Sequence, residues 1–120
     1  MIQFRRDPRP SRPCRFKPGA LVLVDFGRGA VVRVDAACER GGDWAERAYP
    51  GADPDGPWCV VLRHDSARID YAPESALTPD YSKEQIRHPL APKYFKGFID
   101  GVYLRNDVAF EESRDGEDRE

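Results

Sequence analysis

The chain has 120 residues, which is enough for one domain with short tails. Hydrophobic residues make up 40% of it and charged residues 33%, so we expect a small core, and eleven prolines and ten glycines favour short elements joined by turns. No apolar run is long enough to cross a bilayer or to form a signal-peptide core. We therefore expect a cytoplasmic protein with no membrane partner, and targeting to an organelle stays open.

Charge divides the chain into three parts. Residues 1–17 carry six bases against one acid, and residues 107–120 carry seven acids against two bases. The intervening residues are close to neutral, with eleven bases and thirteen acids. Prolines among the first residues remove backbone donors and favour an extended segment. We predict a flexible basic arm over 1–15, a folded domain over 16–106 and an acidic tail over 107–120.

The folded part begins with a predicted hairpin. Residues 20–26 and 30–35 are mostly apolar and read as two strands, and the Gly-Arg-Gly sequence at 27–29 reads as their turn. Residues 36–57 are rich in glycine and proline and form a long excursion, in which 44–48 has the pattern of a short helical turn. A connection of this length in a compact domain is usually functional or poorly ordered.

Two more strands are predicted at 58–64 and 68–72, and a helical turn at 73–77. A short helix is predicted over 92–98, with Pro92 in its first turn. These short elements favour a mainly β fold, a small barrel of about five short strands with a short C-terminal helical segment. The predicted core residues are Val22, Val24, Val31, Val34, Val60, Leu62, Ile69, Tyr71 and Leu77.

An aromatic segment follows the predicted sheet. Residues 88–106 hold four aromatic side chains within ten positions, namely Tyr94, Phe95, Phe98 and Tyr103. Each carries on the order of 150–250 Å² of surface, most of it apolar, so the group is expected either to close one end of the barrel or to form a docking surface.

Catalytic and metal chemistry find little support in the sequence. The three cysteines, Cys14, Cys38 and Cys59, form no CxxC motif, which argues against a disulfide framework and against a zinc site. The two histidines, His64 and His88, lie in no pattern typical of nucleophile activation or metal ligation. We therefore expect a protein that is not an enzyme, with no metal and no cofactor.

Five short motifs follow one another along the chain. In order they are the opening hairpin (Phe16, Gly19, Val22, Gly29, Val31, Asp35), D-x-x-C-x5-W (Asp35, Cys38, Trp44), a strand with Pro57, Trp58, Val61 and Leu62, Y-x-x-E-x-x-L (Tyr71, Glu74, Leu77), and a tail with His88-Pro89, Tyr94-Phe95, Phe98, Tyr103 and Asn106. Their order and spacing resemble the YccV-like domain, also called the hemimethylated DNA-binding domain, whose bacterial namesake is heat-shock protein HspQ. The tail resembles that of the domain in certain F-box proteins.

The resemblance implies an SH3-like barrel that binds DNA without catalysis. A DNA interface needs positive charge, and arginines interleaved with prolines suit a flexible arm that enters a minor groove. The candidate DNA-binding residues are Arg5, Arg6, Arg9, Arg12, Arg15, Arg28 and Arg33. The simpler interpretation, a solvated basic end, stays open.

The resemblance also implies an alternative, an adaptor that delivers substrates to a protease or to a ubiquitin-ligase system. Its partners would be a component of the degradation machinery or the substrates themselves. Interface hot spots favour aromatic residues, and the candidate docking residues are Trp44, Tyr49, Trp58, Tyr94 and Tyr103. The same aromatics could instead be ordinary core residues.

Overall fold

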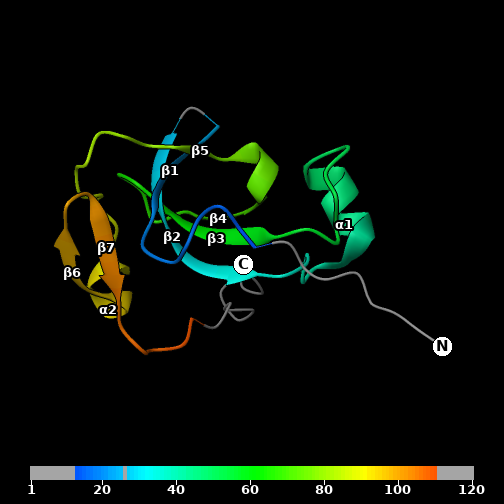
Figure 1. The fold of residues 1–120 in the computed structure, drawn as a ribbon. Helices are drawn as coiled ribbons and strands as arrows, with labels where there is room; N and C mark the ends of the chain where they lie inside the picture. Colours follow the sequence, from blue (N-terminus) through cyan, green and yellow to red (C-terminus); the bar gives the residue numbers. More distant parts are fainter. Residues whose placement is uncertain (1–12, 26, 111–120) are drawn as a thin grey trace.

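A computed structural model describes residues 13–110 of the chain apart from Phe26 (Figure 1). This part is mainly β, as predicted, with seven strands and two α-helices. The elements in chain order are β1 (Leu21–Val24), β2 (Gly27–Asp35), α1 (Gly41–Ala48), β3 (Trp58–Arg63), β4 (Ile69–Pro73), the 3-10 turn η2 (Glu74–Ala76), β5 (Thr78–Pro79), α2 (Ala91–Tyr94), β6 (Phe95–Ile99) and β7 (Val102–Arg105). Within these residues, no helix has the length and apolar character needed to cross a membrane.

The strands form an open sheet. Five of them pair antiparallel in the order β4-β3-β2-β1-β5, and β6 pairs with β7 in a separate hairpin. We expected a closed barrel, but across 13–110, leaving out Phe26, β4 and β5 stay at opposite edges of the sheet. The reason lies in β5, which has only two paired residues and so offers little backbone for closure.

The first hairpin turns earlier than the sequence predicts. Val24 pairs with Gly27, so the chain reverses directly after β1, where Asp25 has a φ of 50°. Gly27 and Gly29 are strand residues of β2, and their lack of a side chain serves close packing. A Cβ on Gly27 would lie 2.2 Å from Nη1 of Arg63, and one on Gly29 would lie 2.5 Å from Cγ1 of Val61.

Each face of the sheet buries its own core. The first core lies between the sheet and the segment from Ile86 to Phe110, and it contains Leu21, Ala30, Val32, Val60, Leu62, Ile86, Ala91, Tyr94, Phe95, Tyr103 and Phe110. The second core lies on the other face, under the N-terminal segment and η2, and it contains Phe16, Val22, Val24, Val31, Cys59, Val61, Ala72 and Leu77. Segments on both sides therefore cover the sheet, which explains why the middle of β2 (residues 30–32) and most of β3 are apolar.

The aromatic segment supplies one of these covers. The predicted helix over 92–98 is too long, because α2 ends at Tyr94 and the chain continues as strand β6 from Phe95. Phe95 stacks on Tyr103 with 4.5 Å between ring centroids, and Phe98 meets the same ring edge-on at 4.6 Å. The pairing of β6 with β7 brings these rings together, and the interpretation as a core cover is confirmed.

Most of the predicted core is buried. The buried members are Val22, Val24, Val31, Val60, Leu62 and Leu77, as predicted. Val34 and Tyr71 are half-buried. The prediction for Ile69 is wrong, because its side chain is 43% exposed at the start of the edge strand β4.

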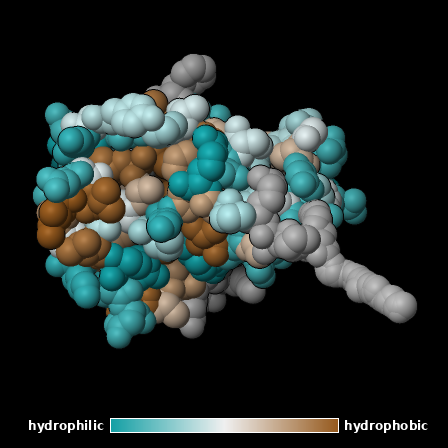
Figure 2. Space-filling view, in the orientation of Figure 1, coloured by the Kyte–Doolittle hydropathy of each residue, from teal (hydrophilic) through white to brown (hydrophobic). Residues whose placement is uncertain are grey.

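The excursion after β2 contains the helix α1. The predicted turn at 44–48 is confirmed as helical, and the helix begins three residues earlier, at Gly41. It lies at the end of the molecule opposite β6 and β7 (Figure 1). Figure 2 shows apolar side chains gathered over the β6–β7 hairpin, where Ile99, Val102 and Leu104 are exposed.

Candidate functional site

The predicted DNA-binding arginines fall into two groups. Arg5, Arg6, Arg9 and Arg12 lie outside the described residues. Arg15, Arg28 and Arg33 are described, and each one is bound to a carboxylate of this chain. Whether they can reach a phosphate depends on how firmly each is held.

Arg15 binds the buried carboxylate of Glu74. Its Nε lies 3.0 Å from Oε2 of Glu74, and its backbone N–H donates to the same oxygen at 2.8 Å. Its Nη2 donates to the carbonyl oxygens of Glu74 and Leu77. This arginine therefore fastens the N-terminal segment to η2, although its side chain is 57% exposed.

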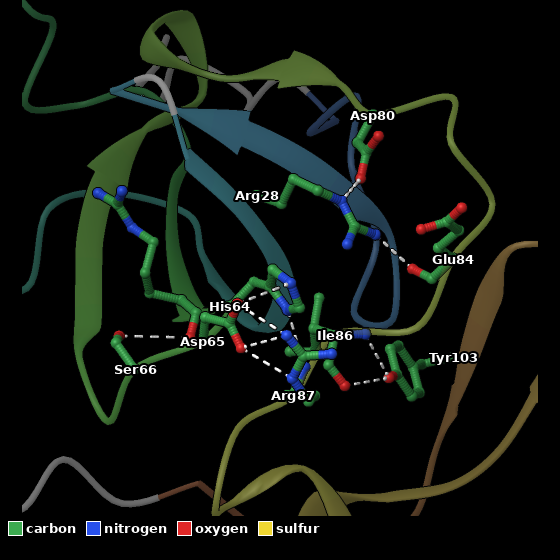
Figure 3. Close-up of polar contacts among 10 residues, drawn as sticks. Arg28, His64, Asp65, Ser66, Asp80, Glu84, Ile86, Arg87 and Tyr103 are labelled. Carbon is green, nitrogen blue, oxygen red and sulfur yellow. Dashed lines mark hydrogen bonds and ion pairs between the residues drawn. The ribbon is translucent and has the colours of Figure 1, made fainter.

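Arg28 is held inside the loops after β5 (Figure 3). Its Nε donates to Oδ2 of Asp80 at 2.7 Å, and its Nη2 donates to the backbone oxygen of Glu84. Burial by itself would raise the pKa of Asp80, but hydrogen bonds from Arg28 and Ser82 outweigh it and lower that pKa. Since the Asp80 side chain is 6% exposed, Arg28 is a structural cation rather than a free one.

Arg33 belongs to a network around Asp35. The guanidinium makes two hydrogen bonds of 2.9 Å to the Asp35 carboxylate, and the hydroxyl of Tyr71 donates to the same group at 2.7 Å. Burial, followed by the hydrogen bond to Asp35, raises the pKa of Tyr71. The backbone N–H of Glu39 in turn donates to the Tyr71 hydroxyl, which ties the start of the excursion to the sheet.

One exposed cation, Arg87, lies at a different place, on the loop that follows β5. Arg87 makes two hydrogen bonds of 2.8 Å to the carboxylate of Asp65, and its backbone N–H donates to Nδ1 of His64 (Figure 3). The side chains of Arg87 and Asp65 are 75% and 54% exposed. An exposed ion pair of this kind contributes little to stability, so Arg87 can turn to a phosphate at small cost.

A groove of about 570 Å³ opens beside Arg87. Its lining includes Gln85, Arg87, His88, Lys96 and Phe98, and none of the described residues that line it is an aspartate or a glutamate. We call it the cationic groove. His88 is buried at its wall, where Nδ1 accepts the Leu90 N–H and Nε2 lies 2.9 Å from the Arg68 carbonyl oxygen, so these contacts give His88 a structural role.

A larger groove of about 1000 Å³ lies between α1 and the edge strand β4. Its lining includes Trp44, Tyr49, Tyr71, Asp25 and Asp70, and we call it the aromatic groove. Trp44 is half-buried, and its ring centroid lies 5.8 Å from that of Tyr71. Burial, with the charges of Asp25 and Asp70, raises the pKa of Tyr49. The lining holds these two carboxylates against one basic residue, Arg40, so the aromatic groove offers phosphate less positive charge than the cationic groove does.

The other predicted docking residues are core residues. Trp58 is wholly buried and packs between Trp44, Tyr49 and Tyr71. Tyr94 and Tyr103 are 4% and 7% exposed. The hydroxyl of Tyr103 accepts a hydrogen bond from the Ile86 N–H and donates one to the Ile86 carbonyl oxygen (Figure 3). Only Trp44 and Tyr49 of the predicted set line the aromatic groove.

The cationic groove escaped the sequence analysis. Its cations come from two separate segments, and neither segment is a basic run. Only the packing of α2 and β6 beside the loop that carries Gln85 and Arg87 brings them together, and no spacing rule signals that contact. Among the described residues, no group of three His, Cys, Asp or Glu side chains is placed to hold a metal ion.

Comparison with known proteins gives one match. A family model described as "Hemimethylated DNA-binding protein YccV like" matches residues 15–102. It spans all five strands of the open sheet and ends at the start of β7. Neither the curated proteins nor the solved structures gave a match.

Proposed function

The chain belongs to the YccV-like family of hemimethylated DNA-binding proteins, and on this premise we propose that it is a non-enzymatic module that binds duplex DNA through its cationic groove. The family match over residues 15–102 carries the proposal. The structure contributes the choice of surface, because it separates the cations that are already engaged from those that can reach a phosphate.

Exposure of the arginines supports this choice. The Arg28 and Arg33 side chains are 21% and 27% exposed, and the carboxylates that they bind are nearly buried. Releasing either arginine would leave a buried charge without its partner, which is strongly unfavourable. The side chain of Arg87 is held by an exposed ion pair with Asp65, so its release would leave no buried charge. Arg87 and the exposed Lys96 are therefore the cations best placed for DNA.

The lining of the groove suits a nucleic acid in two further ways. Gln85 offers the amide that reads adenine edges, and the half-buried ring of Phe98 offers an apolar surface for a base or a methyl group. The opposite end of the molecule is unsuitable, since residues 36–57 carry five acids against Arg40 and Arg47. DNA is expected on the side of β6 and α2, away from α1.

A salt-titrated duplex-binding assay tests the proposal. The full chain is titrated against one duplex in three forms, unmethylated, hemimethylated and methylated on both strands. Arg87→Ala and Lys96→Ala should each lower affinity about equally for all three forms if they contact phosphates, and should reduce the salt slope by about 1. The matched control is Arg47→Ala, which removes an exposed arginine from α1 and should leave affinity unchanged.

The same assay separates the groove from the N-terminal arginines. A variant that lacks residues 1–12 removes Arg5, Arg6, Arg9 and Arg12 but keeps Arg15 on Glu74. Loss of binding in this variant alone would assign the interface to those four residues instead of the groove. Absence of salt-sensitive binding to every duplex near 50 mM salt would reject the DNA proposal altogether.

One observation favours the second candidate, an adaptor for a protease. The aromatic groove is the larger of the two, and it brings the predicted docking residues Trp44 and Tyr49 to one surface with the exposed Ile69. An ATP-dependent protease of the Lon type, reconstituted with a model substrate, provides the test. An adaptor should accelerate degradation, and Trp44→Ala should remove the acceleration. An unchanged rate with the native chain would end this candidate.

A further inference from the structure

Two of the three cysteines lie next to each other in the fold. The Sγ atoms of Cys14 and Cys59 are 3.8 Å apart, although 45 positions separate them in the chain. Cys59 is wholly buried in β3, and Cys14 is half-buried in the N-terminal segment. No local motif predicts that they pair, because neither belongs to a CxxC motif.

The two residues that follow Cys14 hold it in place. Arg15 binds Glu74 through its side chain and through its backbone N–H. Phe16 is 6% exposed in the second core, and its backbone N–H lies 3.4 Å from the Cys14 sulfur. These contacts therefore keep the two thiols close together without any covalent bond between their sulfur atoms.

We propose that Cys14 and Cys59 are a redox modification site, at which a peroxide joins the two sulfur atoms in a disulfide bond. In the first step the Cys14 sulfur attacks one oxygen of hydrogen peroxide, an S–O bond forms, and the O–O bond breaks. The hydroxide that leaves takes the thiol proton and becomes water, so Cys14 becomes a sulfenic acid.

In the second step the Cys59 sulfur attacks the sulfur of Cys14. The S–S bond forms, the S–O bond breaks, and the departing hydroxide takes the Cys59 proton as a second water. Two thiols and one peroxide thus give one disulfide and two waters, with the sulfur atoms oxidised by two electrons and the peroxide reduced by two.

The environment of the two thiols orders the steps. Burial, with the nearby Cys14 thiol, raises the pKa of the Cys59 thiol, so this group stays protonated and unreactive toward solvent oxidants. Cys14 is the more exposed of the pair and is the group that a peroxide reaches first. Cys38 stands apart, with its sulfur 3.8 Å from the Gly41 carbonyl oxygen, and it serves as an internal control.

The disulfide would join the N-terminal segment to a central strand of the sheet. It would close a loop that contains β1, β2 and α1, and a cross-link over a loop of this length restricts the unfolded chain.

Peroxide titration of the reduced full-length chain tests the site. We expect the number of thiols that react with maleimide after the chain is unfolded in denaturant to fall from three to one, and a tryptic map to show Cys14 joined to Cys59 with a loss of two hydrogens. The melting temperature should rise by roughly 10 °C and return to its starting value on reduction. Cys38→Ser should behave like the native chain, whereas Cys14→Ser should form no cross-link.

Several results would overturn the proposal. They are three reactive thiols after peroxide treatment, a cross-link that includes Cys38, a cross-link between two copies of the chain, or over-oxidised Cys14 without a cross-link. If Cys14→Ser does not fold, the map of the Cys38→Ser chain decides, because it retains both proposed sulfur atoms and no other.

Discussion

The guanidinium of Arg28 and the carboxylate of Asp80 form an ion pair with 2.7 Å between Nε and Oδ2, and this pair joins the start of β2 to the chain that leaves β5. The two residues are 52 positions apart. Their contact turns a predicted DNA-binding arginine into part of the scaffold, and it places the following loop, with Gln85 and Arg87, beside the β6–β7 hairpin.

Replacement of Arg28 should therefore affect stability. Arg28→Ala leaves the nearly buried Asp80 carboxylate without its cation, but Ser82 still donates two hydrogen bonds to it. We expect a loss of about 2 kcal/mol in the free energy of unfolding, measured by urea denaturation. The salt slope of DNA binding by the folded fraction should stay unchanged, because Arg28 is not expected to contact a phosphate. A variant with native stability and weakened binding would return Arg28 to the DNA interface.

The same pair predicts a dependence on pH. Because the folded state lowers the pKa of Asp80 below its ordinary value of 3.8, the stabilisation is complete above that value and is lost as pH falls through the lowered pKa. Asp80→Asn should be less stable than the native chain by about 1–2 kcal/mol at pH 6. The difference should shrink as the pH falls below 3.8, and a constant difference down to pH 2 would contradict the assignment.

Replacement of Tyr71 tests the hydrogen-bond network that ties residues 36–57 to the sheet. Tyr71→Phe keeps the ring against Trp44 and Trp58 but removes the donor to Asp35 and the acceptor for the Glu39 N–H. We expect a loss of about 1–2 kcal/mol on urea denaturation. Amide exchange in α1 should accelerate more than in β3, since the hydroxyl joins the excursion to the sheet. Equal acceleration in both elements would mean that the network does not act locally.

Gly19 marks the point where β7 meets the sheet. Its N–H donates to Val31 O, its carbonyl oxygen accepts the Tyr103 N–H, and its φ of 102° is rare for other residues. A Cβ here would lie 2.2 Å from the Tyr103 carbonyl oxygen. Gly19→Ala should therefore lower the free energy of unfolding by about 2–3 kcal/mol.

Gly51 provides the control for this change. Its φ is also positive, at 87°, but nothing lies within 4 Å of an added Cβ. Gly51→Ala should cost only the backbone strain, about 1 kcal/mol. Similar losses in the two variants would show that strain alone, and not the contact with Tyr103, determines the requirement at Gly19.

Local patterns were enough to predict much of this protein. Mostly apolar segments marked β1, β2 and β3, alternation marked β4, and the order of short motifs indicated the YccV-like family. The helical turn around Trp44 and the covering role of the aromatic segment also followed from nearby residues. Each of these features depends on backbone periodicity or on the hydrophobic effect acting over a short stretch.

The tertiary structure decided which side chains are free to act. Arg28 and Arg87 look alike in the sequence, yet one meets a nearly buried carboxylate and the other an exposed one. Cys14 and Cys59 touch only because the N-terminal segment packs on the sheet. The strength of an ion pair and the reactivity of a thiol depend on burial and on partners that are distant in the chain. Neighbouring residues in the sequence predict neither the burial nor the partners.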